Sequence, residues 1–232
     1  MYILHIETST SICSVALSKD DELVACDERS EGMNHAALLA PQIHHLLYDV
    51  SVKPGELSAI SVSSGPGSYT GLRVGSSTVK GMAYSLGIPV VSVPTLFALG
   101  QAALERNPDA AWVLPMIDAR RREVYASLYD TSMQEIWPVS SVILDEDFIK
   151  GSLPAEGKLV CCGDGALKIG DLALKTGHMA IASDLLCSAR HLVRPAFDLY
   201  HRGVLHDPLH FVPYYHKPPN ITVPKNEGFV GR

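Results

Sequence analysis

The chain has 232 residues, of which 47% are hydrophobic and 19% are charged, and its formal net charge is −6. This composition excludes a disordered protein, because disordered chains are poor in apolar residues and rich in net charge. The acidic balance disfavours a protein that holds nucleic acid by itself, since such proteins usually carry a basic surplus. The length predicts one or two domains with a core that needs no disulfide or metal.

No targeting or membrane signal is apparent. The first residues, 1–7, lack a positively charged segment and a long apolar run, so we expect no signal peptide. No uninterrupted apolar run approaches the ~18 residues of a transmembrane helix. The five cysteines are odd in number and have no C-x-x-C spacing, which favours reduced, buried thiols. We therefore expect a cytoplasmic protein without a membrane partner.

The first hundred residues predict strands and helices in alternation. In chain order, apolar runs and turn signals predict strands at 2–8, 12–17 and 23–26, a helix within 34–50, a strand at 57–64, a helix ending near 86, a strand at 90–93 and a helix at 95–105. Leu39, Ile43 and Leu46 form the helical stripe of 34–50. Pro41 predicts that this helix either begins or kinks there. Gly87 suits the end of the next helix.

The pattern restarts near residues 106–109 as a shorter copy. It predicts strands at 112–117, 123–129 and 136–139, a helix near 145–150, a strand at 158–162 and a terminal helix at about 183–204 that contains Pro195. Two such halves predict an α/β fold of two related lobes with mixed sheets. We assign 1–105 to the first lobe, joined by the terminal helix, 106–182 to a reduced second lobe, and 207–232 to an extended tail.

The segment 65–75, GPGSYTGLRVG, is the most informative stretch. A glycine turn between a strand and a helix leaves free N–H groups at the helix N-terminus, which can hold an anion. The segment is neither a Walker A loop nor a G-x-G-x-x-G motif. The Ser/Thr-rich turn after the first strand can donate to an oxyanion too, or can be an ordinary hairpin turn. The candidate nucleotide-binding residues are Thr8, Ser9, Thr10, Gly65, Gly67 and Ser68. Phosphate contact and a merely tight turn remain open alternatives.

The helix after this loop is unusually rich in small residues. Each glycine inside a helix costs ~0.8–1 kcal/mol relative to alanine, so a close neighbour should require them. We favour a helix of a partner protein over packing on the chain's own sheet. The predicted partner interface consists of Leu39, Ile43, Leu46, Leu72, Gly75, Ser76, Val79 and Met82.

The sequence gives little support for a metal site or for a catalytic nucleophile. The ten histidines offer no i, i+4 pair on a helix, because Pro208 separates His206 from His210. No serine or cysteine has the surroundings of a catalytic nucleophile. We predict no metal site and no catalytic residue. The arginines at 120–122 form either a solvated turn or a contact with an acidic partner.

The sequence resembles the bacterial TsaB (YeaZ) family along nearly its whole length. The motifs that carry the resemblance are Ile6–Thr10, Asn34-His35, Gly65–Gly75, Asp118–Tyr125, Gly163–Ala166 and, in the tail, Pro213–Tyr215 with Pro218–Thr222. The resemblance implies an actin-like/sugar-kinase (ribonuclease H-like) ATPase fold whose second lobe is reduced. It also implies a role in making threonylcarbamoyladenosine on the adenosine next to the tRNA anticodon.

In that family the catalytic paralogue is TsaD, and the resemblance implies that this chain is its non-catalytic partner. It implies TsaD and the ATPase TsaE as partners, tRNA contact only through the complex, and a homodimer as an option for the free chain. No cofactor is then required by the isolated chain, although ATP or ADP can lie at or near the complex interface. Related ATPases usually have Asp where Glu7 stands, and the extra methylene displaces the carboxylate. The alternative is an active small ATPase or small-molecule kinase; peptidase activity is disfavoured.

Overall fold

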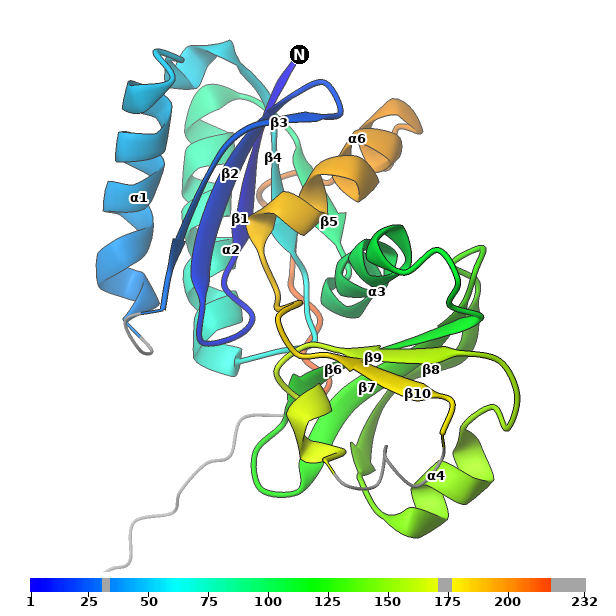
Figure 1. The fold of residues 1–232 in the computed structure, drawn as a ribbon. Coiled ribbons are helices and arrows are strands. Elements are labelled where there is room, and N and C mark those ends of the chain that lie inside the picture. Colours follow the sequence, from blue (N-terminus) through cyan, green and yellow to red (C-terminus); the bar gives the residue numbers. More distant parts are fainter. Residues whose placement is uncertain (31–33, 171–176, 218–232) are drawn as a thin grey trace, which may run out of the picture.

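The computed structural model describes residues 1–30, 34–170 and 177–217. These residues form two five-stranded sheets, of order β3-β2-β1-β4-β5 and β10-β9-β6-β7-β8. Each sheet builds one lobe, and the two lobes lie one above the other (Figure 1). No helix in the described ranges is both long and apolar enough to cross a lipid bilayer.

The first sheet is built around β1. Its strands are β1 (Tyr2–Glu7), β2 (Cys13–Lys19), β3 (Glu22–Arg29), β4 (Leu57–Ser63) and β5 (Val90–Val93). β1 pairs antiparallel with β2 and parallel with β4. Successive side chains of β1 face opposite sides of the sheet, so Leu4 and Ile6 enter one apolar cluster and Ile3 enters another.

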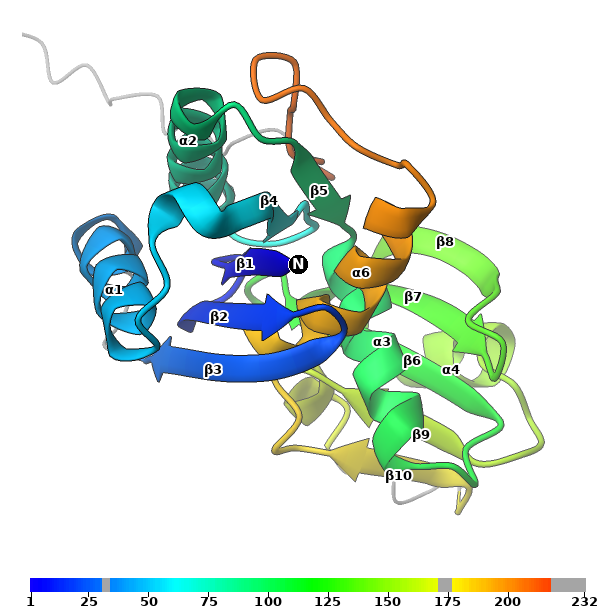
Figure 2. The same cartoon turned by 90° about the horizontal axis from the view of Figure 1, so that it is seen from above.

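Helices cover both faces of this sheet. α1 (His35–Asp49) and α2 (Tyr69–Leu86) lie side by side on one face, and α6 (Val193–His201) lies on the other (Figure 2). α1 runs through Pro41 without ending there. α2 ends at Gly87, whose φ of 66° is the left-handed conformation that glycine adopts without steric cost.

The second sheet repeats the first. Its strands are β6 (Trp112–Asp118), β7 (Glu123–Asp130), β8 (Glu135–Ile143), β9 (Leu159–Cys162) and β10 (Met179–Ala182). The helix α4 (Glu146–Ser152) lies between β8 and β9 in the chain. β6 pairs antiparallel with β7 and parallel with β9, as β1 does with β2 and β4. The predicted α/β architecture of two related halves is confirmed. The sequence analysis did not predict β10, which pairs parallel with β9 at the edge of this sheet.

α3 (Thr95–Arg106) lies between the two sheets (Figure 1). Leu99 and Ala103 pack into the core of the second lobe, whereas Ala98 packs against the first sheet. The helix that the sequence assigns to the first lobe therefore contributes to the cores of both.

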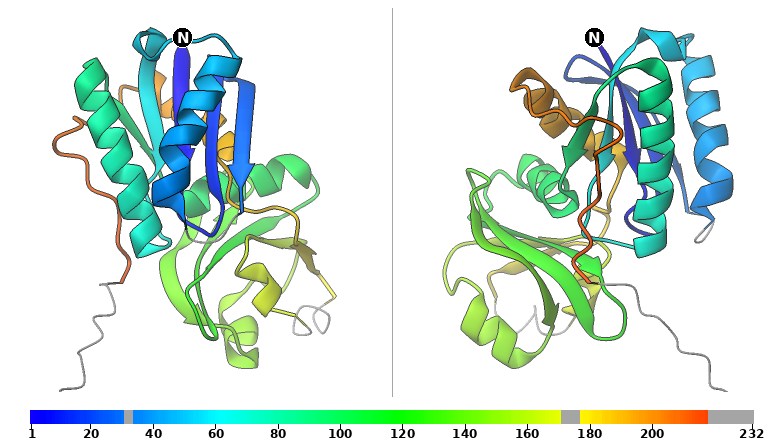
Figure 3. Two further views of the ribbon diagram at one scale, coloured as in Figure 1. Left: turned by 90° about the vertical axis from the view of Figure 1, so that its left-hand side faces the viewer. Right: turned by 180° about the vertical axis from the view of Figure 1, so that it is seen from behind.

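The C-terminal helix is shorter than the predicted 183–204. It consists of a 3-10 turn, η3 (Ala189–Leu192), and α6. Pro195 is the third residue of α6 and lies in its first turn. Because a backbone N–H there has no partner within the helix, this proline does not interrupt α6. The chain then returns along α2 toward the second lobe (Figure 3). The predicted tail is described as far as residue 217, and the motif at 218–222 lies outside the described residues.

Candidate functional site

The glycine loop between β4 and α2 packs directly on the turn that follows β1. The Ser68 N–H donates to the Ser9 carbonyl at 2.7 Å, and the Thr8 Oγ1 donates to the Gly71 carbonyl at 2.9 Å. Ser68 is also the N-cap of α2, where its side chain accepts from the Gly71 N–H. These bonds join the predicted phosphate-binding segments to each other.

The glycines of this loop are required by the close approach of that turn. A Cβ atom on Gly67 would lie 2.5 Å from the Ser9 carbonyl oxygen, and one on Gly71 would lie 2.0 Å from the Thr8 carbonyl oxygen. A Cβ on Gly75 would lie 2.3 Å from the Thr8 Oγ1. These distances are too short for any side chain, so packing within the chain accounts for Gly67 in the loop and for two of the small residues of α2, Gly71 and Gly75.

Gly65 is constrained from the other side of the loop. Its φ is 108°, and a Cβ would lie 2.4 Å from the carbonyl oxygen of Tyr214. The Tyr214 N–H donates to the Ser64 carbonyl at 2.7 Å. Thr95, at the start of α3, accepts from the Gly65 N–H through its Oγ1 at 3.0 Å. The loop is therefore enclosed by the chain's own C-terminal segment and by α3.

Glu7 ends β1 at the boundary between the lobes, where its side chain is buried. One carboxylate oxygen, Oε1, accepts from the Ser9 N–H at 2.6 Å and from the Ser63 Oγ at 2.8 Å. Burial raises the pKa of the Glu7 carboxyl, the hydrogen bonds from Ser9 and Ser63 oppose this, and the charge of Asp164 adds to it. Glu7 is thus a buried carboxyl that accepts two hydrogen bonds from the first lobe.

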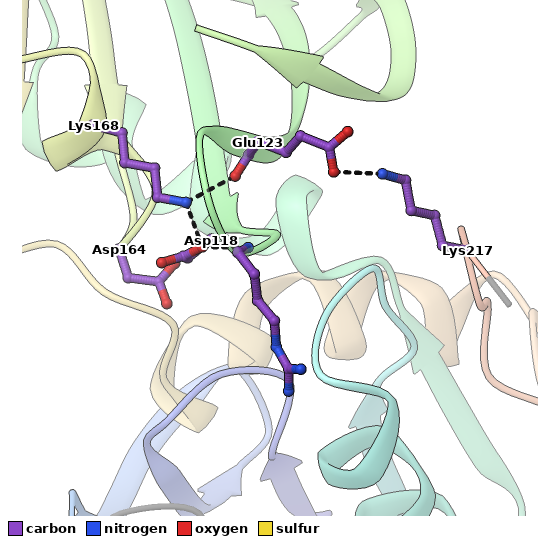
Figure 4. Close-up of polar contacts among 6 residues, drawn as sticks. Asp118, Glu123, Asp164, Lys168 and Lys217 are labelled. Atoms are coloured by element: carbon purple, nitrogen blue, oxygen red, sulfur yellow. Dashed lines mark hydrogen bonds and ion pairs between the residues drawn. The ribbon is translucent and has the colours of Figure 1, made fainter. Parts of the chain in front are cut away.

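Asp164 follows β9 in the second lobe, at the position that corresponds to the loop after β4. Its Oδ1 accepts from the Asp118 N–H at 2.9 Å. Burial raises the pKa of Asp164, and the nearby Asp118 charge contributes. Lys168 joins this cluster: its Nζ donates to the Asp118 Oδ1 at 2.5 Å and to the Glu123 carbonyl at 2.9 Å (Figure 4).

The structure thus brings together all of the candidate nucleotide-binding residues. Thr8, Ser9, Thr10 and Gly65 are buried, and Gly67 and Ser68 are partly buried. The Ser68 N–H is bonded to the Ser9 carbonyl and the Gly65 N–H to the Thr95 Oγ1, whereas the buried Ser9 hydroxyl oxygen has no hydrogen-bond partner among the described residues. The nucleotide site at these residues remains a prediction.

The arginines at 120–122 are exposed at the β6–β7 turn. A solvated turn and a contact with an acidic partner both remain open interpretations of them.

The predicted partner interface needs correction. Leu39 and Val79 are at most 1% exposed, because they fill the core between the helices and the first sheet. Leu72 is 2% exposed and faces the chain's own loop at Gly65. The remaining predicted residues are also buried, apart from a partly buried Met82: Ile43, Leu46, Gly75 and Ser76. A helical apolar stripe marks the buried side of a helix and does not say what covers it.

The outward sides of α1 and α2 form a different surface, which we call the outer α1–α2 face. Its exposed residues are Ala40, His44 and Tyr48 of α1 and Ser77, Gly81 and Tyr84 of α2. Tyr48 is 76% exposed and Tyr84 is 65% exposed. A Cβ on Gly81 would meet no atom within 4 Å, so internal packing does not require this glycine. The sequence feature that could have indicated this face is the set of small residues on the side of α2 opposite its apolar residues.

Metal-ligand side chains do not gather in the described ranges, where no three of His, Cys, Asp or Glu could hold an ion together. The cysteines are free thiols. Burial raises the pKa of Cys161 to about 12 and that of Cys13 to about 11, so both stay protonated at neutral pH.

Comparison with known proteins adds to this geometry. Residues 30–152 match the family model described as "TsaD: tRNA N6-adenosine threonylcarbamoyltransferase", and the chain is 38% identical to the Bacillus subtilis "tRNA threonylcarbamoyladenosine biosynthesis protein TsaB" over 147 residues. The chain belongs to the TsaB/YeaZ family. The Escherichia coli protein of the same description is 35% identical over 137 residues. These matches cover 62% and 59% of this chain, and 63% and 58% of the two relatives, which is less than two thirds of their length.

Solved structures extend the TsaB/YeaZ match to almost the whole fold. The structure "YeaZ from Pseudomonas aeruginosa" is 27% identical, with a TM-score of 0.77 over 92% of this chain and 99% of that one. The activator of the 2-hydroxyisocaproyl-CoA dehydratase from Clostridium difficile shares the fold alone, with a TM-score of 0.55 and 9% identity over 88% and 97% of the chains. The fold is the predicted actin-like ATPase fold.

Proposed function

We propose that this chain is a non-catalytic subunit of the assembly that makes threonylcarbamoyladenosine on the adenosine next to the tRNA anticodon. Membership of the TsaB/YeaZ family and the match to the TsaD family model support this role. The chain orders its TsaD-like paralogue, a TsaE-type ATPase joins them, and tRNA is held by the whole assembly. Such an assembly works where tRNA is found, in the cytoplasm.

The glycine loop carries the case against catalysis by this chain. An ATPase of this fold needs the groups at the ends of β1 and β4 to face a nucleotide phosphate. Here the Thr8–Ser9 turn packs so closely on the loop that Gly67 and Gly71 have no room for a Cβ. Glu7 is engaged by Ser9 and Ser63. A carboxylate held in this way is less free to position a magnesium ion or a water molecule, which supports a subunit that needs no nucleotide of its own.

The outer α1–α2 face is the surface through which we propose that the TsaD-like paralogue docks. Exposed tyrosines are enriched at protein interfaces, and Tyr48 and Tyr84 stand on this face. Ser77 and Gly81 are small and exposed between them, which lets a partner helix approach α2 closely. The same face serves the free chain when it forms a homodimer.

Size-exclusion chromatography of the two purified proteins tests this docking surface. Gly81→Arg and Ser77→Arg place a long charged side chain on the exposed side of α2 and should abolish the heterodimer without lowering the melting temperature. Gly151→Arg is the matched control, because Gly151 is also an exposed helical glycine with no atom near its missing Cβ. A heterodimer that survives both α2 variants would exclude this face.

Titration of the isolated chain with ATP and magnesium tests the absence of catalysis. We expect neither binding nor turnover by the chain alone, with ATP or ADP bound at the complex interface instead. Micromolar binding together with hydrolysis would favour an active ATPase or small-molecule kinase.

A further inference from the structure

The described C-terminal segment, residues 207–217, connects the two lobes a third time, after the passages from α3 to β6 and from β10 to α6. We call it the strap. It begins where His206 pairs with Val90 at the edge of the first sheet, with hydrogen bonds of 2.8 and 3.0 Å. It then runs beside α2 and reaches the second lobe (Figure 3). Lys80 of α2 holds its course by donating from Nζ to the carbonyls of Leu209 and Phe211.

The strap has a first anchor on the glycine loop. The Tyr214 N–H donates to the Ser64 carbonyl at 2.7 Å, and the Tyr214 carbonyl oxygen lies 2.4 Å from the position that a Cβ of Gly65 would take. The ring of Tyr215 packs on that of Tyr69, the first residue of α2, with centroids 4.8 Å apart. The strap thereby holds the loop from the side opposite the β1–β2 turn.

Its second anchor lies on β7 in the other lobe. The Lys217 Nζ binds the Glu123 Oε2 at 2.6 Å (Figure 4). The His216 ring meets the edge of the Tyr125 ring at 5.4 Å, and the Tyr214 hydroxyl is 2.9 Å from the His216 Nδ1. Tyr214 and Tyr215 therefore contact the first lobe, and the next two residues contact the second.

A chain of polar contacts continues from the second anchor to the lobe boundary. Lys168 joins the Glu123 carbonyl to the Asp118 carboxylate, and the Asp118 N–H donates to Asp164 (Figure 4). Asp164 lies close enough to Glu7 of the first lobe to raise its pKa. The strap anchor is thus connected to the residues that meet across the boundary.

We propose that residues 214–217 are a latch that fixes the orientation of the two lobes and the conformation of the glycine loop. Two-lobed proteins close and open about hinges, and a third connection outside the hinge opposes that rotation. Each contact of the latch is weak alone, because the Lys217 and Glu123 side chains are 41% and 37% exposed. Together they span both lobes, so loosening either anchor releases the loop and the β6–β7 turn at once. The latch is independent of the proposed partner.

Hydrogen–deuterium exchange of the full chain tests the latch. Lys217→Glu places two like charges together at the second anchor. We expect amide exchange to rise about two- to fivefold both in 64–72 and in 119–126, although these segments belong to different lobes. Glu123→Lys should do the same, and the double variant that swaps the two charges should restore the original exchange. Lys150→Glu is the matched control, because it also breaks a lysine–glutamate pair, within the second lobe only.

Tyr215→Ala examines the first anchor. Loss of the ring contact should raise exchange in the same two segments by about three- to tenfold. Tyr48→Ala, which removes an exposed tyrosine of α1 on the first lobe, should leave both segments unchanged. The latch is overturned if exchange stays unchanged in Lys217→Glu and Tyr215→Ala, or if each variant affects only the lobe that it contacts. If Tyr215→Ala fails to fold, the exchange of Lys217→Glu, Glu123→Lys and their double variant decides between the same two outcomes.

Discussion

Gly71 lies directly against the backbone of Thr8, and a Cβ on Gly71 would stand 2.0 Å from the Thr8 carbonyl oxygen. The Thr8 hydroxyl in turn donates to the Gly71 carbonyl at 2.9 Å. This contact seats the first turn of α2 on the β1–β2 turn. It explains why a glycine-rich loop occurs here without the spacing of a known phosphate-binding motif.

Gly71→Ala should therefore destabilise the fold by about 2–4 kcal/mol, because the new methyl group overlaps a backbone oxygen that cannot move freely. Urea unfolding at equilibrium measures this. Gly81→Ala is the matched substitution on the exposed side of the same helix and should stabilise the chain by about 0.5–1 kcal/mol. Equal effects at the two positions would contradict the packing seen around Thr8.

Glu7→Gln tests the buried carboxyl at the end of β1. The pKa of Glu7 is raised by burial above its ordinary value of 4.5, so the folded state binds its proton more tightly than the unfolded state does. The stability that this proton contributes is complete below the unfolded pKa and is lost as pH rises through the folded pKa.

Glutamine keeps an acceptor for Ser9 and Ser63 but cannot ionise. The stability of the variant relative to the natural chain should therefore increase from pH 4 to pH 8. Unfolding free energies of both proteins across this range check the sign. A difference that does not change with pH would show that Glu7 has an ordinary pKa.

For the buried His5 we expect stability to change with pH in the opposite direction. It lies in the middle of β1, where its ring bonds the Ser61 Oγ at 2.6 Å and the Ser18 Oγ at 2.9 Å. Burial lowers the pKa of His5 to about 3, so the unfolded state takes up the proton first as pH falls below about 6.5. The protonation of His5 in the unfolded state should lower the free energy of unfolding by roughly 1.4 kcal/mol for each pH unit between pH 6 and pH 4. In His5→Gln this part of the acid dependence should vanish, as measured by chemical unfolding at each pH.

Most elements of the fold follow from local pattern. The strand at Val90–Val93 and the helix end at Gly87 were predicted at their observed positions, because glycine, proline and short apolar runs act locally. The helices that bear Leu39 and Val79 were also predicted, but the partner of their apolar faces was not. Helical periodicity is the same whether a stripe packs on its own sheet or on another protein.

The site depended on contacts between distant segments. Gly65 is required by Tyr214, which is almost 150 residues away in the sequence, and Gly71 is required by Thr8. Composition can indicate that glycines need a close neighbour, but only the fold identifies it. The pairing of Lys217 with Glu123 was hidden for the same reason, since exposed charges follow no periodic pattern.

Reconstituted synthesis of threonylcarbamoyladenosine, from this chain, its TsaD-like and TsaE-like partners, unmodified tRNA and an activated donor of the threonylcarbamoyl group, tests the central claim most directly. Product is measured by nucleoside analysis with the natural chain, with Glu7→Gln and with Gly81→Arg. A scaffold predicts full product with Glu7→Gln and almost none with Gly81→Arg. Loss of product with Glu7→Gln in an intact complex, or full product with Gly81→Arg, would contradict a non-catalytic subunit that acts through the outer α1–α2 face.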